Sequence, residues 1–320
     1  MKRLVDWWLT PMPAPRLALL RVAIGSIALI YLGIRVPHLL GLADYVAGQF
    51  HPIGIASVLA EPLPEWLLIT SVGLSLLCGA AFVAGLGFAL SGPAFALSFL
   101  WITTYRSSFG MIFHTENLLA LHLLLLGASR CADALSVDAR RRQQTMPEPG
   151  ADYGWPVRAL CVVTVLAYFL AGVAKLKLAG GPWLEGELLR RQIAYDNLRK
   201  LELGTSVFPL GPWLVRHRGV FPVLAVTTML VELGAPLALV RARVAKAWVA
   251  AAWGFHVGVL LFMSIAFFYQ LSGFAYLPFF PVERAWAWLL SRRQRGRAAQ
   301  VNALLDSPSA NPGSESRSSS

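Results

Sequence analysis

Long apolar runs recur along almost the whole chain, and they restrict its fold more than any other feature. A membrane-spanning helix needs roughly 20 apolar residues. Candidate spans lie at about residues 17–36, 66–90, 93–104, 114–128, 157–176, 220–240, 247–265 and 267–281. The runs at 93–104 and 267–281 are short, so we expect them to be tilted, broken or re-entrant. The sequence therefore predicts an all-α integral membrane protein, a polytopic helical bundle of about eight spans.

Composition indicates one membrane domain rather than a soluble protein. Of the 320 residues, 56% are hydrophobic and 14% are charged, whereas a soluble domain has about 25% charged residues. Because the apolar runs extend from Leu17 to Phe280, we expect a single transmembrane domain over residues 1–300 and a disordered Ser-rich tail at 301–320. No small-residue cleavage site follows the first apolar run, so we expect an uncleaved first span rather than a signal peptide.

The placement of basic residues predicts the orientation in the membrane. The net charge is +11, and the excess lies at the ends of the apolar runs, where the positive-inside rule places it. We therefore expect membrane lipid rather than nucleic acid as a partner. With the N-terminus in the cytoplasm of a bacterium, eight spans put the basic segments 129–157, 241–246 and 284–297 inside, so both termini are cytoplasmic. The outer loop 175–218 is an exception, since it carries eight basic residues.

Residues 183–203 of that loop, WLEGELLRRQIAYDNLRKLEL, predict an amphipathic helix that does not span the membrane. Leu188, Ile193 and Leu198 recur at near-helical spacing, with basic residues between them. Such a helix can lie in the plane of the interface, anchored by Trp183. The alternative is a lid over a pocket between the spans, and the sequence leaves both open.

Lys175 lies at the end of the fifth apolar run, where an ionisable residue is costly and suggests a function. Tyr168, Gly172 and Lys175 share one helical face, and Gly172 lets another helix approach closely. Lys175 is therefore expected either to point into the bundle as a buried, reactive amine or to snorkel to the headgroups. Lys177 points elsewhere and fits snorkelling better.

Three more polar residues occupy costly positions. His114 opens the fourth run, as an interfacial residue of a capped helix start or as a proton donor or acceptor facing a cavity. Glu232 lies deep in the sixth run, where it is either protonated or bonded to a neighbouring helix, or has a function. His256 lies mid-run, as a satisfied core residue or a functional one. No metal-ligand spacing occurs and the three cysteines form no CxxC, so we predict no metal site.

These segments together resemble a known family. The stretch AYFLAGVAKLKLAGGPWLEG is preceded by FHTENL, SRCADALSVDARRR and, near the start, LLRVAIGSIAL; an acidic residue in a span and a Phe-His pair follow. Their order is similar to that of the transmembrane domain of vitamin K-dependent gamma-glutamyl carboxylases, which bacterial proteins share under the label HTTM, the horizontally transferred transmembrane domain. The resemblance extends from about residue 16 to 284.

The resemblance implies residue roles and a cofactor. Lys175 matches the lysine that deprotonates reduced vitamin K in the carboxylases, and His114 matches the histidine that assists it. Tyr168, Gly172, Glu232 and His256 would then line the cofactor site, and the cofactor would be reduced vitamin K or menaquinol. A neutral lysine in a dry pocket suits this proton transfer, and a quinone suits a pocket between spans.

Two departures from the carboxylases keep two functions open. Ala174 stands where the vertebrate enzyme has a second lysine, and we expect no large extracytoplasmic domain for binding a substrate's propeptide. The chain is therefore either a quinol-linked enzyme that modifies a peptide, or a non-enzymatic maturation, immunity or transport factor for a secreted peptide. In the second case the basic residues of the 175–218 loop would bind the peptide or a separate extracytoplasmic subunit.

Overall fold

The computed structural model describes residues 2–112, 114–205 and 208–292. It contains two compact units, Met1–Phe280 and Pro281–Ser320. In the second unit residues 282–292 are helical, whereas the tail predicted at 301–320 lies outside the described residues. All elements discussed below belong to the first unit. Its described residues form helices and no β-strand, which confirms the predicted all-α class.

Five helices among the described residues are long and apolar enough to cross a membrane. They are α2 (Ala14–Leu40), α3 (Glu65–Ala84), α4 (Phe88–Arg106), α7 (Ala151–Ala179) and α12 (Ala242–Met263). The other three predicted spans are short or interrupted: α5 (Asn117–Gly127), α11 (Phe221–Leu233) with η5 (Ala235–Leu239), and α13 (Phe268–Leu271) with η6 (Phe274–Phe279). The sixth and eighth predicted spans therefore change from α-helix to 3-10 helix along their length.

The remaining elements are short helices at the ends of the long ones. They are α1 (Lys2–Trp8), η1 (Gly41–Asp44), η2 (Ala47–Gln49), η3 (Gly54–Val58), α6 (Val137–Arg141), α8 (Gly181–Leu184), α9 (Glu187–Glu202), α10 (Leu210–Val215) and η4 (Arg218–Val220). The amphipathic helix predicted at 183–203 corresponds to α8 and α9.

The predicted boundary between the second and third spans is wrong. The run 66–90 is not one helix, because α3 ends at Ala84 and α4 begins at Phe88, and the run 93–104 is thus the inner part of a full-length helix. Gly85 and Gly87 separate the helices with φ values of 65° and 54°. Glycine alone adopts this left-handed conformation without steric cost. Apolar composition continues through the turn, so hydropathy alone did not reveal it.

Two of the sequence motifs stabilise this turn. Arg21 of α2 is buried and its Nη2 donates a hydrogen bond to the carbonyl of Leu135 at 2.7 Å. Asp138 accepts hydrogen bonds from the backbone N–H groups of Gly87 at 3.0 Å and Phe88 at 2.9 Å. The carboxylate therefore caps the first turn of α4, where the helix dipole also favours negative charge. The motifs LLRVAIGSIAL and SVDARRR thus connect α2, the 128–138 loop and α4.

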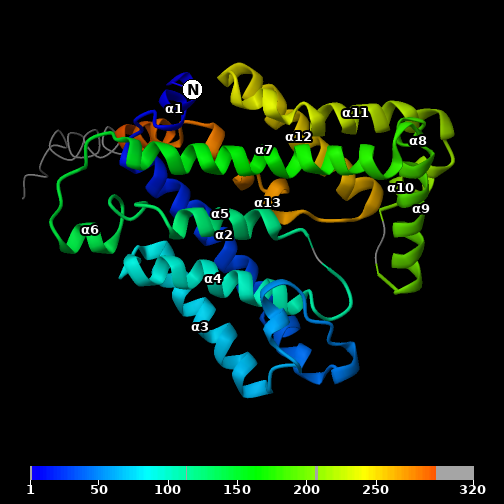
Figure 1. Cartoon of the computed structure of the whole chain (residues 1–320), viewed down its shortest axis with the longest axis horizontal. Coiled ribbons are helices and arrows are strands. Elements are labelled where there is room, and N and C mark those ends of the chain that lie inside the picture. The colour runs from blue at the N-terminus through cyan, green and yellow to red at the C-terminus, as the bar shows by residue number, and fades with distance from the viewer. Residues whose placement is uncertain (1, 113, 206–207, 293–320) are drawn as a thin grey trace, which may run out of the picture. The chain divides into compact units, whose positions relative to one another are not determined.

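Helix α7 is the longest helix and packs against α2, α5, α11, η5 and η6. Figure 1 shows α8 and α9 at the C-terminal end of α7, and α1 and α6 near its N-terminal end. In the same view α9 runs across the direction of α7 rather than along it. This arrangement is compatible with the first of the two predicted alternatives, a helix in the plane of the interface. Trp183 is 4% exposed and packs against Ala225 and Met229 of α11, so its predicted role as an interfacial anchor is wrong.

Candidate functional site

The candidate site begins where α7 and α11 approach each other at Gly172. A Cβ atom added to Gly172 would lie 2.9 Å from Leu233 Cδ2 and 3.0 Å from Glu232 Cβ. The close helix approach expected at this glycine is therefore present. One turn further along α7, Lys175 Nζ donates a hydrogen bond to Glu232 Oε1 and forms an ion pair with it.

Lys175 points toward the protein rather than outward. Its side chain is 25% exposed and that of Glu232 is 3% exposed. Lys175 Nζ also lies 5.5 Å from the ring centroid of Trp183, within the range of a cation–π contact. Lys177 is exposed, as an interfacial anchor would be. Of the two orientations predicted for Lys175, the structure thus has the inward one.

Glu232 is held by a single hydrogen bond. Its Oε1 is bonded to Lys175, whereas its buried Oε2 has no hydrogen-bond partner among the described residues. The helix that carries Glu232 ends one residue later, at Leu233, and the chain continues as η5. A buried carboxylate with an unused oxygen is costly, so packing alone does not account for this group.

A groove of about 410 Å³ lies beside Lys175. Its walls come from the end of α7, from Trp183 of α8 and from one face of α9; the lining residues are Ala174, Lys175, Leu178, Ala179, Trp183, Leu188, Arg191, Gln192 and Tyr195. Mostly apolar walls with a few polar groups are typical of small-molecule sites. Helix α9 thus forms one wall of a groove as well as lying across the end of α7.

Tyr168 and His256 belong to a separate buried cluster. His256 Nε2 lies 2.7 Å from the hydroxyl of Tyr168, which lies 2.6 Å from the hydroxyl of Tyr276. His256 Nδ1 is buried and has no hydrogen-bond partner in the described part of the chain. Neither Tyr168 nor His256 lines the groove. The structure therefore divides the predicted site residues into the lysine–glutamate pair at the groove and a hydroxyl–imidazole cluster further inside the bundle.

His114 does not open a helix, and that prediction is wrong. Helix α5 begins at Asn117, and His114 is exposed in the preceding segment. Its ring centroid lies 5.5 Å from that of Phe267, whose ring also packs on His256 at 4.7 Å. His114 is absent from the groove lining. Between His114 and α5 lies Glu116, which is buried and occupies the N-cap position of the helix.

Glu116 forms a buried cluster that the sequence analysis did not predict. Arg106 Nη1 donates hydrogen bonds to Tyr31 at 2.6 Å and to Glu116 Oε1 at 3.0 Å, and Tyr31 also bonds Glu116. The cluster joins α2, α4 and the start of α5. The signal was available, because Arg106 lies two residues after the apolar run 93–104 and Glu116 lies near the start of the run 114–128.

His122 is a second unpredicted member of the buried polar core. It is fully enclosed, with Nδ1 2.6 Å from the Tyr269 hydroxyl and Nε2 3.0 Å from Thr164 Oγ1. Both ring nitrogens are thus satisfied, and the residue joins α5, α7 and α13. His122 is thus a core histidine with satisfied hydrogen bonds, which is one of the two alternatives predicted for His256.

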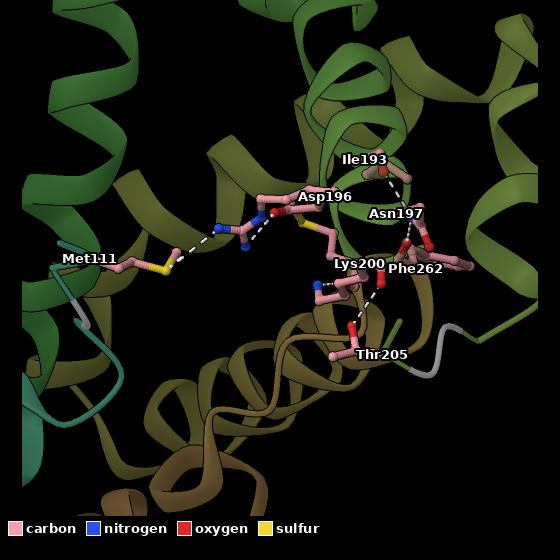
Figure 2. A network of polar contacts seen from close by, with 9 residues as sticks. Met111, Ile193, Asp196, Asn197, Lys200, Thr205 and Phe262 are labelled. Atoms are coloured by element: carbon pink, nitrogen blue, oxygen red, sulfur yellow. Dashed lines mark hydrogen bonds and ion pairs between the residues drawn. The ribbon is translucent and has the colours of Figure 1, made fainter. Parts of the chain in front are cut away.

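Helix α9 is attached to the last turn of α12, as Figure 2 shows. Asn197 Nδ2 donates to the carbonyls of Ile193 and Phe262, both at 2.7 Å, and Lys200 donates to the carbonyl of Met263. The carbonyls at the C-terminal end of α12 lack intrahelical partners. Two of them are thus satisfied by side chains of α9.

The other basic residues of α9 are paired within the same helix. Arg190 and Arg191 both bond Glu187, and Arg199 lies 3.3 Å from Asp196. The hydrogen bonds from Arg190 and Arg191 lower the pKa of Glu187 to about 2. The basic side chains predicted to bind a peptide are therefore already engaged by acidic or carbonyl groups of the protein.

Comparison with known proteins gives one match. A family model described as HTTM domain matches residues 9–286. No curated protein matches the chain. No solved structure matches it either. The matched range includes α7, α8, α9 and α11, and with them every residue of the groove and of the lysine–glutamate pair.

Proposed function

The chain belongs to the HTTM domain family, whose membrane domain also occurs in vitamin K-dependent carboxylases, and on this basis we propose that it is a carboxylase-like membrane enzyme that uses a reduced quinone. The observation that supports the proposal most is the position of Lys175. It lines a largely apolar groove and is bonded to the buried Glu232. A proton-transfer group at the polar end of an apolar groove is what the reaction requires.

The residues of the groove fit a quinone. A volume of about 410 Å³ lies within the range of roughly 300–1,000 Å³ that is usual for small-molecule sites. Leu178, Leu188 and Trp183 offer apolar contacts for a ring and an isoprenoid tail, while Lys175 and Tyr195 offer polar ones. Glu232 Oε2 has no hydrogen-bond partner among the described residues, so it can accept a proton, as a proton-transfer site requires.

In the proposed reaction, Lys175 Nζ removes a proton from a hydroxyl group bound in the groove. A reduced naphthoquinone held in the groove would supply the reducing power for a reaction with oxygen that is coupled to modification of a peptide. Lys175 Nζ lies over the ring of Trp183 on one side and is bonded to Glu232 on the other. His114 contacts Phe267 and does not line the groove, so we assign it no part in this proton transfer.

We propose the cytoplasmic membrane of a bacterium as the location, with both termini in the cytoplasm and the groove at the outer face. The basic segments near α6 and at the start of α12 support this orientation. A peptide substrate, or a separate extracytoplasmic subunit that carries it, would then approach α9 from outside. The non-enzymatic alternative has less support, because the basic residues of α9 are engaged within the protein.

The proposal is tested with purified protein and menaquinol or vitamin K hydroquinone. We expect epoxide formation, measured by liquid chromatography and mass spectrometry. Lys175→Ala should lower the rate by about 100-fold or more, since general bases contribute about 10²–10⁴-fold. Lys177→Ala is the matched control, because it removes an exposed lysine of the same helix turn. Unchanged turnover by Lys175→Ala would refute the proposal.

A further inference from the structure

We propose that Lys175 and Glu232 act as one proton-accepting unit, in which Glu232 is the final acceptor and Lys175 passes the proton to it. The inference builds on the proposed function, since it concerns the same proton transfer. It makes Glu232 a positioning residue that acts through the lysine. In this unit Lys175 works as an ammonium rather than as a free amine.

In the proposed unit the resting pair is an ammonium and a carboxylate. A carboxylate within hydrogen-bond distance favours the charged form of a lysine, and Glu232 Oε1 is bonded to Lys175 Nζ. An ammonium group has three donors and no acceptor. Lys175 paired in this way therefore has no lone pair with which to remove a proton. The group of the pair that can accept a proton is the carboxylate of Glu232.

The geometry makes Lys175 the route to that carboxylate. Glu232 is 3% exposed and does not line the groove, whereas Lys175 is 25% exposed and does. Glu232 Oε1 is bonded to Nζ, and Oε2 has no hydrogen-bond partner among the described residues. A proton that enters from the groove thus reaches Glu232 by exchange at Nζ.

The exchange conserves protons and charge. Nζ gives one of its protons to Glu232 Oε1, and the lone pair that this leaves on Nζ takes a proton from a ligand hydroxyl. The ligand O–H bond and one N–H bond break, while a new N–H bond and the O–H bond of Glu232 form. Lys175 stays an ammonium and becomes the counter-ion of the ligand's oxygen anion, and Glu232 becomes neutral. Burial favours this result, because a neutral carboxyl group is less costly to bury than a carboxylate.

The charge state of Lys175 can be measured without any quinone. Phenyl isothiocyanate reacts with neutral amines, and peptide mass spectrometry separates its products at Lys175 and at Lys177, the exposed lysine that serves as an internal reference. In the unmodified protein at pH 8 we expect Lys175 to react more slowly than Lys177. In Glu232→Gln the ratio of Lys175 to Lys177 labelling should rise at least tenfold, because the amide retains the shape but not the charge.

Two further variants separate charge from structure. Glu232→Asp keeps the carboxylate and should keep labelling of Lys175 slow, and Glu202→Gln, an exposed change on α9, should leave the ratio unaltered. An unchanged ratio in Glu232→Gln would overturn the inference. If that variant does not fold, labelling of Lys175 in the unmodified protein as fast as that of Lys177 overturns it equally.

Turnover gives a second readout. At neutral pH, Glu232→Gln should lower quinol consumption at least tenfold, and the deficit should narrow as pH rises and the free amine takes over. A purely structural role of Glu232 would lower the rate by the same factor at every pH. If the unmodified protein consumes no quinol, the proposed function fails, while the labelling ratio still decides whether Glu232 holds Lys175 as an ammonium.

Discussion

Gly172 is the single residue on which the contact between Lys175 and Glu232 most directly depends. It lies one turn before Lys175 on the same face of α7, and its missing side chain leaves room for the Cβ of Glu232. In membranes, small residues at helix crossings allow close packing of this kind. The approach at Gly172 brings the carboxylate within reach of the lysine.

Gly172→Ala tests that dependence. The added Cβ would lie 3.0 Å from Glu232 Cβ, which belongs to the stem of that side chain, so α11 must move. We expect a loss of about 1–3 kcal/mol in unfolding free energy, as overpacking usually costs, measured by thermal unfolding in detergent. Gly254→Ala in α12 is the control, because a Cβ there meets nothing within 4 Å. Equal stability of the two variants would contradict the packing argument.

At the residue scale, the sequence identified individual site residues but not the contacts between them. Lys175 and Glu232 were both singled out, because ionisable groups in apolar runs are costly. Their pairing was not predicted, since they lie 57 residues apart. Helical periodicity shows which residues share a face of one helix, but it does not show which helix that face meets.

At the scale of elements, the turn between α3 and α4 depends on Asp138 of α6, about 50 residues further along the chain. Its carboxylate bonds the N–H groups of Gly87 and Phe88. These hydrogen bonds, that of Phe88 foremost, lower the pKa of Asp138, and nearby Arg142 and Arg141 act in the same direction. A depressed carboxyl pKa contributes stability above the unfolded pKa, and this contribution is lost as pH falls through the folded pKa.

Asp138→Ala should therefore destabilise the protein in a pH-dependent manner. At pH 7 we expect a loss of about 1 kcal/mol, the usual cost of removing an N-cap. The difference from the unmodified protein should shrink below about pH 4, near the ordinary range of an Asp carboxyl, as Asp138 becomes protonated. Thermal unfolding of both proteins from pH 3 to pH 7 measures this. A difference that stays constant over this range would show that the carboxylate does not cap α4.

The existence of elements was predicted more reliably than their ends. Hydropathy located all the apolar segments, because burial in lipid requires them. It placed the end of the second span within α4, since the glycines of the turn interrupt no apolar pattern. It also did not reveal that α11 stops at Leu233, where Gly234 and Ala235 begin a 3-10 helix. The 3-10 helix packs against α7 and α12.

At the scale of the whole molecule, the proposed orientation places α9 and the groove outside the cell. It can be tested with single cysteines at two exposed positions, Leu203→Cys after α9 and Gln144→Cys after α6. A membrane-impermeant maleimide should label the Leu203→Cys variant in intact cells. It should label the Gln144→Cys variant only after the cells are permeabilised. The native Cys131 and Cys161 are buried, and Cys78, which is partly exposed, is replaced by serine in both variants. The reverse labelling pattern would contradict the orientation and place the groove in the cytoplasm.

Helix α9 is fixed to two membrane-spanning helices at once. Through α8 it continues directly from the end of α7, and through Asn197 and Lys200 it is bonded to the last carbonyls of α12. Since α9 is one wall of the groove, the width of the groove follows the separation of these two helix ends. Bilayer thickness changes the tilt of spanning helices, so the lipid composition of the membrane becomes a physical variable of the site. The affinity of the groove for a ligand, when measured in one detergent or lipid, therefore describes the protein in that environment.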